Sequence, residues 1–257
     1  MGAAVWGIVV RDLSRSWRQK SRVIGGLARP FMWLLLIGSG YNAIARVEGA
    51  VSYQAFVLPG IIVMALFFGA MLTAISTVYD REFGILRLML ASPGGAPAML
   101  VGRAVAATIV GALQGGVVLV CMPLFVAVTG RQLMAAAIAV LIGAAASSVL
   151  GLLVASRLRS VENFAGVINV VLFPLLFLSG ALYPTAHLPV ALRTAARLNP
   201  VTYAVDLTRA ALGQVAEFSV SYSLTVLGLT TVVAFALTVV LFDPEQRFVL
   251  RSRAPKS

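Results

Sequence analysis

The sequence has few of the residues from which catalytic and metal sites are built. One of its 257 residues is cysteine (Cys121), one is histidine (His187), and nine are Asp or Glu. A single cysteine excludes a disulfide framework and a cysteine metal site, and a single histidine leaves no cluster of imidazoles. No glycine-rich run ends in Gly-Lys-Ser or Gly-Lys-Thr, so the sequence lacks a phosphate-binding loop for ATP. The energy for any active process must therefore come from another chain.

Charge is scarce as well. Only 11% of the residues are charged and 60% are hydrophobic, with a mean hydropathy of +0.97. A soluble domain of this length carries about 25% charged residues. The net charge of +11 could suggest nucleic acid, but the basic residues flank apolar runs, which is typical of membrane proteins. We therefore expect an all-α integral membrane protein with one membrane domain over 1–257, surrounded by the lipid bilayer and binding no nucleic acid.

The first residues predict an amphipathic helix rather than a cleaved signal peptide. The apolar start at 3–10 is followed at once by Arg11, without a cleavage-site pattern. Residues 3–22 carry an apolar stripe and a basic stripe at helical spacing, which favours a helix in the headgroup layer over a solvated helix end. The apolar stripe consists of Trp6, Val9, Leu13 and Trp17, and the basic stripe of Arg11, Arg15, Arg18 and Arg22.

Apolar runs predict six membrane spans. They lie near 28–45, 54–79, 97–128, 133–155, 163–182 and 221–242. The third run exceeds the roughly 20 residues that a bilayer needs, so we expect tilt or a break near Pro123. Between spans five and six, residues 184–220 are mixed in character and contain three prolines. They predict two short re-entrant or external helices, near 188–197 and 202–213.

The distribution of Lys and Arg predicts the orientation. Fifteen of the twenty basic residues fall on one side of the predicted membrane: in 11–29, up to the first turn of span one, in 81–103, up to the first turns of span three, at 157 and 159, or after span six. The other five fall on the opposite side. The positive-inside rule then places both termini, and the segment between spans two and three, in the cytoplasm of a cell whose cytoplasmic membrane the chain crosses.

A charged segment interrupts the apolar runs between spans two and three. It runs from Asp80 to Pro93, with charges at 80, 81, 82 and 87. Phe83, Leu86 and Leu90 recur at helical spacing. We expect one helix of thirteen residues, roughly 20 Å long, which is too short to span a bilayer but long enough to contact a soluble partner.

Polar residues inside the predicted spans are rare. The clearest are Gln114, Asn163 and Asn169, which mark a possible intramembrane substrate path. For Gln114 and Asn169 we favour an interhelical hydrogen bond over a contact with substrate.

Three stretches in order resemble the membrane subunit of type-2 ABC transporters, the exporter permeases for daunorubicin-type drugs and nodulation factors. The first is the charged segment, Asp80-Arg81-Glu82-Phe83-Gly84-Ile85-Leu86-Arg87-Leu88-Met89-Leu90-Ala91-Ser92-Pro93. The second is Leu178-Ser179-Gly180-Ala181-Leu182-Tyr183-Pro184 with Leu188-Pro189, and the third is Leu198-Asn199-Pro200-Val201-Thr202-Tyr203-Ala204-Val205-Asp206-Leu207-Thr208-Arg209. Asp80 departs from the glutamate that is usual in the family but keeps the charge.

The resemblance implies a second permease copy, identical or similar, and two copies of a cytoplasmic ATPase that binds ATP and Mg. The chain itself then needs no cofactor. The segment 81–92 would be the coupling helix, and its ATPase-coupling residues would be Asp80, Arg81, Glu82, Phe83, Gly84, Leu86, Arg87 and Leu90. The external re-entrant motif would contain Gly180, Pro184, Asn199, Pro200, Tyr203, Asp206 and Arg209. We expect Asp206 and Arg209 to form an exposed ion pair on an external helix, while Phe83 suits its own bundle and a partner's groove equally well.

These features together predict a permease subunit of an ATP-driven exporter, not an enzyme. Aromatic residues make up only 9% of the sequence, which favours a hydrophobic, drug-like or lipid-like substrate over a polysaccharide or glycoconjugate. An intramembrane enzyme would need a cluster of titratable residues, and a partner-independent carrier would need charged or broken helices at the midplane. Neither pattern is present in the sequence.

Overall fold

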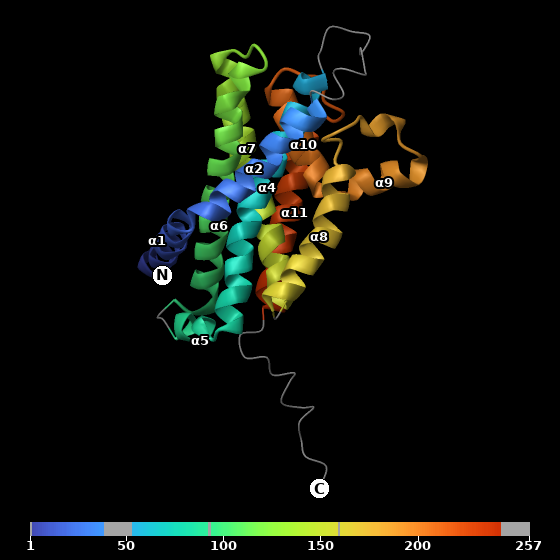
Figure 1. The fold of residues 1–257 in the computed structure, drawn as a ribbon. Coiled ribbons are helices and arrows are strands. Elements are labelled where there is room, and N and C mark those ends of the chain that lie inside the picture. The colour runs from blue at the N-terminus through green and yellow to red at the C-terminus, as the bar shows by residue number, and fades with distance from the viewer. Residues whose placement is uncertain (1, 39–52, 92–93, 159, 243–257) are drawn as a thin grey trace.

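The computed structural model describes residues 2–38, 53–91, 94–158 and 160–242. Within these ranges the chain is helical, without strands (Figure 1). The long helices are α4 (Tyr53–Glu82), α6 (Gly95–Cys121), α7 (Gly130–Arg157) and α11 (Val220–Leu241). α6 continues through a 3₁₀ turn to Leu124, and all four are long and apolar enough to cross a membrane. They coincide with the predicted spans two, three, four and six, and the 3₁₀ turn confirms the break expected at Pro123.

Two other predicted spans are shorter in the structure. α2 (Lys20–Trp33) passes into a π-helical turn, Leu34–Gly38, and the rest of the predicted span 28–45 lies outside the described residues. α8 (Val161–Phe177) has seventeen residues and contains Pro174. The integral membrane, all-helical fold is therefore supported, and the count of six spans stays a prediction.

α4 forms the centre of the bundle. Of its most apolar stretch, 89% is buried inside the chain, against 17% for α11. It lies close to α6 because glycines face each other: a Cβ on Gly69 would come within 2.8 Å of the Gly111 Cα atom. Small residues permit such close helix approach in membranes. α11, in contrast, leaves most of its apolar surface open to the surroundings of the chain.

The charged segment is not one helix, and the predicted rod of thirteen residues is wrong. α4 continues through Asp80 to Glu82, the chain turns at Phe83 and Gly84, and a separate helix α5 covers Ile85–Leu90. Gly84 has a φ of +74°, a conformation that glycine adopts without steric cost. α5 is therefore a helix of about 9 Å, lying at the end of the bundle where α4 ends and α6 begins (Figure 1).

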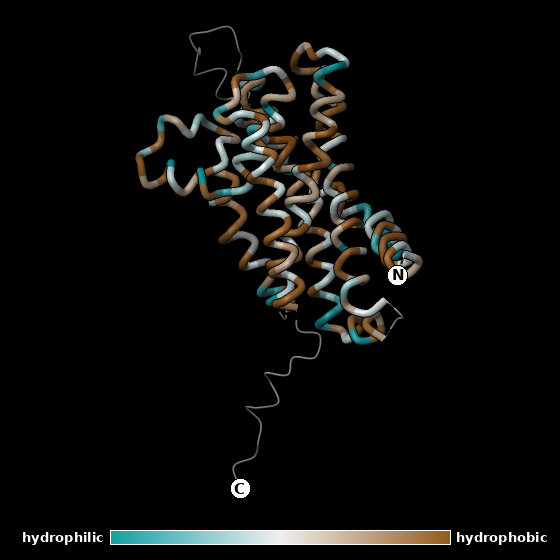
Figure 2. The backbone as a smooth tube through the Cα atoms, turned by 180° about the vertical axis from the view of Figure 1, so that it is seen from behind, coloured by the Kyte–Doolittle hydropathy of each residue, from teal (hydrophilic) through white to brown (hydrophobic). Residues whose placement is uncertain are grey.

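The remaining helices lie around this bundle. α1 (Gly2–Arg18) packs against α6, where Ile8 sits over Gly102. α9 (Val190–Leu198) and α10 (Pro200–Ala211) confirm the two short helices predicted between spans five and six. Hydrophobic residues follow the lengths of the long helices, while hydrophilic residues gather at helix ends and along α1 (Figure 2).

Candidate functional site

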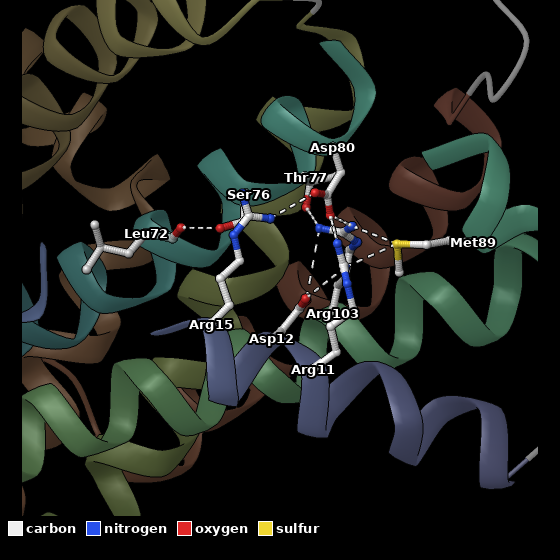
Figure 3. Close-up of polar contacts among 9 residues, drawn as sticks. All are labelled: Arg11, Asp12, Arg15, Leu72, Ser76, Thr77, Asp80, Met89 and Arg103. Carbon is white, nitrogen blue, oxygen red and sulfur yellow. Dashed lines mark hydrogen bonds and ion pairs between the residues drawn. The ribbon is translucent and has the colours of Figure 1, made fainter. Parts of the chain in front are cut away.

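Asp80, in the last turn of α4, is the centre of a buried group of charges. Its side chain is fully buried and accepts hydrogen bonds from three guanidinium groups. Arg15 Nη1 lies 2.8 Å from Asp80 Oδ1, Arg11 Nη2 lies 3.1 Å from Oδ2, and Arg103 of α6 donates to the same Oδ2 (Figure 3). Together with Asp12 of α1, these residues are called the Asp80 cluster here.

The cluster joins four helices. Arg103 is also fully buried, and its Nη1 donates to Thr77 Oγ1 at 2.9 Å, one turn before Asp80. The Met89 sulfur of α5 lies 3.2 Å from Arg11 Nη1 and 3.3 Å from Arg103 Nη2. Figure 3 shows these side chains converging from α1, α4, α5 and α6. Met89 therefore places α5 against arginine side chains of α1 and α6, which in turn bind Asp80 of α4.

The charges of the cluster are unequal in number, with three arginines for two carboxylates. Arg11 Nη1 lies 3.2 Å from Asp12 Oδ1, and Arg103 Nη1 lies 4.0 Å from Asp12 Oδ2. Burial raises the pKa of Asp12, against the opposing effect of Arg103 and Arg11. Removing one partner from a buried ion pair costs far more than an exposed pair contributes, because the other charge stays buried. The arrangement is therefore stable only with Asp80 in place.

Arg81 and Glu82 bind the turn between α7 and α8. Arg81 Nη1 donates to the carbonyl oxygens of Ala155, Ser156 and Leu158, at 2.8–3.1 Å, where α7 ends. Glu82 Oε2 accepts the N–H of Val161 at 3.0 Å, at the start of α8. These contacts engage both side chains within the chain, in addition to any contact with a partner.

The outward side of the turn and of α5 is apolar and basic. Phe83 is 60% exposed and Leu88 is 77% exposed, with the Arg87 side chain also exposed between them. Leu86 is buried against Ile8, Met99 and Leu100, and Leu90 packs at the edge of this group. We call Phe83, Gly84, Arg87 and Leu88 the α5 face.

Of the predicted coupling residues, the structure thus places three on the α5 face: Phe83, Gly84 and Arg87. It buries Asp80 and Leu86, which can act on a partner only by holding α5. Leu88 and the arginine partners of Asp80 were missed from the sequence. One signal could have found Arg103, since a single basic residue inside an apolar helix needs a buried partner.

The expected exposed ion pair between Asp206 and Arg209 is wrong, since both side chains are buried. Asp206 accepts the N–H groups of Glu217 and Phe218, at 2.6 and 2.9 Å, from the loop before α11. Arg209 donates to the Gly180 carbonyl at 3.0 Å and stacks on the Phe56 ring at 4.4 Å. Burial lowers the pKa of Arg209. Asp206 thus binds backbone N–H groups of another segment, and Arg209 binds a backbone carbonyl and an aromatic ring, so the two side chains do not form an ion pair with each other.

The rest of the predicted external motif also forms internal contacts. Asn199 caps α10 through the Val201 N–H, at 3.0 Å, and donates to the Leu175 carbonyl at the end of α8. Pro200 is the first residue of α10, Gly180 has a φ of +76°, and Pro184 precedes a 3₁₀ turn, Thr185–His187. Tyr203 donates to the Arg197 carbonyl, and burial raises its pKa to about 12. The motif thus holds α8, α9, α10 and the start of α11 together.

The three polar residues predicted inside spans have different settings. Asn163 is exposed near the start of α8, where Ser160 caps its N–H at 3.2 Å. Asn169 lies in the same helix. Gln114 of α6 is 2% exposed, and its carboxamide makes no hydrogen bond to any residue that the structure describes. For Gln114 the expected interhelical hydrogen bond is therefore wrong.

The described part of the chain holds no group of three Cys, His, Asp or Glu residues placed to bind a metal ion. An apolar, basic face lies on a short helix, and buried charges link that helix to the bundle.

Comparison with known proteins finds matches over most of the chain. Residues 3–212 match the family model described as "ABC-2 type transporter". A protein of Pyropia yezoensis whose name describes it as a transport permease (ycf38) is 30% identical over 79% of this chain and 71% of its own length. Nodulation protein J of Rhizobium leguminosarum bv. trifolii is 30% identical over 81% of both chains. An Escherichia coli K12 protein whose name describes it as a multidrug ABC transporter permease (YbhR) is 27% identical over 78% of this chain and 53% of its own.

Proposed function

The chain belongs to the ABC-2 type transporter family as a membrane permease of an ABC exporter, and we propose that the α5 face is the surface through which a cytoplasmic ATPase drives it. One observation carries the proposal. Phe83 and Leu88 are exposed apolar side chains on the same short segment whose inward side contacts the Asp80 cluster through Met89. The segment therefore has one side available to a partner and one side engaged with the bundle.

The chemistry of the α5 face suits a groove on a soluble protein. Buried apolar anchors supply most of the affinity of such contacts, and an arginine at their edge adds selectivity. Lipid is a poor alternative occupant, because α5 lies at the end of the bundle (Figure 1), next to the charged residues Asp80, Arg81 and Glu82 that end α4. The ATPase would bind ATP and Mg, since the sequence lacks a phosphate-binding loop.

The Asp80 cluster would pass the ATPase movement into the membrane. Closure of the ATPase on ATP would push α5, and the contacts of Met89, Arg11 and Arg103 would carry this push to α1 and α6. Arg81 and Glu82 would carry it to α7 and α8 through the turn that they bind. A single input would then move most of the bundle.

The assembly would contain two permease chains, identical or similar, and two ATPases. Each permease would cross the cytoplasmic membrane six times, with both termini and α5 in the cytoplasm. The cargo would be a hydrophobic small molecule, drug-like or lipid-like, because few aromatic residues are available to stack on sugars. A polysaccharide or glycoconjugate is the second candidate, since one relative is named nodulation protein J and others are named only as transport permeases.

Co-purification with the ATPase encoded beside the gene tests the proposal. Leu88→Glu places an unpaired charge in the proposed contact, so we expect the complex to weaken at least tenfold while the permease still folds. The matched control is Val215→Glu, a 93% exposed valine near the start of α11, at the opposite end of the bundle from α5. Equal recovery of the ATPase with both variants would overturn the role of the α5 face.

A further inference from the structure

A cavity of about 640 Å³ lies between the N-terminal helices and α6, away from the α5 face. Its wall consists of the end of α1, the beginning of α2 and the middle of α6. Most of the wall is apolar, formed by Leu13, Val23, Leu27, Ile109, Leu113 and Val117. The volume falls within the roughly 300–1,000 Å³ that small-molecule sites occupy, and such sites combine an apolar lining with a few placed polar groups.

Gln114 is the buried polar group of this cavity. It is 2% exposed, and neither its Nε2 donor nor its Oε1 acceptor has a hydrogen-bond partner among the described residues. The carboxamide packs closely against two glycines. A Cβ on Gly26 of α2 would lie 3.1 Å from both its nitrogen and its oxygen, and a Cβ on Gly69 of α4 would lie 3.1 Å from its oxygen. A buried donor and acceptor without partners is unfavourable, so a ligand that satisfies both gains affinity.

The charge of the wall selects among ligands. Among the described residues, Arg18, an exposed residue at the end of α1, is the one charged side chain on the wall, and Ser14 and Ser16 also line the cavity. No acidic side chain from the described part of the chain lines it. The wall therefore disfavours cations and accepts neutral or anionic ligands.

We propose that this cavity binds an amphiphile with an apolar chain, an amide group and an anionic end, such as an N-acyl amino acid. The chain packs against the leucine and valine side chains. The amide N–H donates to Gln114 Oε1, and the amide carbonyl accepts from Gln114 Nε2. The anionic end pairs with Arg18. The binding site does not depend on the proposed export function, whereas a role of the bound amphiphile as cargo rests on it.

Quenching of tryptophan fluorescence tests the site, because Trp17 lines the cavity. The full chain, with Trp6→Phe and Trp33→Phe, retains Trp17 as its single tryptophan and is studied in lipid nanodiscs. The probe is an N-acyl glycine with bromine at the end of its acyl chain. We expect saturable quenching, and about tenfold weaker binding of the N-methyl analogue, which lacks the amide N–H and leaves Gln114 Oε1 unpaired. In Gln114→Leu the two probes should bind equally and weakly. Two probes measured on two variants form a double-mutant cycle, which isolates the contact between the amide and Gln114.

A matched pair of variants controls for folding and for partition of the probe into the bilayer. Val117→Phe fills the cavity and should abolish saturable quenching. Val120→Phe adds the same bulk to the same helix at a 76% exposed position that does not line the cavity, and should retain it.

Three results would overturn the site. The first is quenching that never saturates, which would result if a second permease copy covered the cavity. The second is equal affinity of the unaltered chain for both probes, and the third is a preference for the probe with the amide N–H that persists in Gln114→Leu. Any of these with normal ATPase recovery leaves the coupling proposal intact. Saturable binding with no ATPase recovery would instead overturn the coupling proposal alone.

Discussion

At the scale of single residues, Asp80 holds one end of several helices together. Its carboxylate accepts from Arg11, Arg15 and Arg103, and it has no exposed surface. Asp80 and the neighbouring Asp12 are the counter-charges of these three arginines. Asp80 was predicted as an ATPase-coupling residue, and the contacts that the structure describes for it lie within the chain.

Asp80→Asn should lower the free energy of unfolding by about 3–5 kcal/mol, because the buried Arg103 and the partly exposed Arg11 and Arg15 lose their main counter-charge. Glu82→Gln is the control, since Glu82 is exposed and accepts one backbone hydrogen bond, from Val161, worth about 1 kcal/mol. Denaturant titration of the purified chain in detergent measures both. A loss for Asp80→Asn no larger than that for Glu82→Gln would contradict the account of the cluster.

Asp12 should make stability depend on pH in the opposite direction from an ordinary paired carboxylate. Burial raises its pKa in the folded chain above 3.8, so the folded chain holds the proton more tightly than the unfolded chain. The resulting stabilisation is complete below pH 3.8 and is lost as the pH rises through the folded-state pKa. Asp12→Asn stays neutral, so its midpoint of unfolding should rise relative to the wild type across this interval. A difference that stays constant with pH would contradict the prediction.

At the scale of elements, the long helices could be predicted and α5 could not. Length and hydropathy alone identify α4, α6, α7 and α11, because membrane helices need long apolar runs. The charged residues at 80–82 are typical of a helix start, but here they end α4 because their partners lie on α1, α6 and the α7–α8 turn. Sequence spacing does not show where such partners lie.

Gly84→Ala tests the break between α4 and α5. Its φ of +74° disfavours alanine although no atom lies within 4 Å of the added Cβ, so backbone strain alone should cost about 1–2 kcal/mol. Gly130→Ala is the matched control, because Gly130 also has open space, a helical position and no positive φ. It should be neutral or stabilising. Thermal unfolding in detergent compares the two, and equal midpoints would show that the turn tolerates a side chain.

The elements between α8 and α11 show a second limit of the sequence. The two short helices were predicted within a few residues, since prolines mark their ends. The three-residue spacing of Asp206 and Arg209 is typical of an ion pair on one helix face. The loop before α11 and the end of α8 instead supply N–H and carbonyl partners, and the sequence does not place these segments against α10.

At the scale of the whole molecule, the family and its membrane character could be predicted, and the internal contacts of the charged residues could not. Composition and three ordered stretches of sequence suffice to predict the family and its membrane character, and the family match over residues 3–212 confirms this prediction. These contacts join residues that are far apart in the sequence, such as Glu82 and Val161, which are 79 positions apart. The packing around the Gln114 carboxamide likewise depends on glycines from two other helices.

Site-specific photocrosslinking tests the central claim most directly. A photoreactive amino acid at position 88, in the assembled complex with its ATPase, should form a covalent adduct with the ATPase, and the same group at position 215 should not. Adducts at 88 with the ATPase would place the α5 face in the coupling contact. An assembled complex in which position 88 forms no adduct with the ATPase, or in which position 215 forms one instead, would contradict the account.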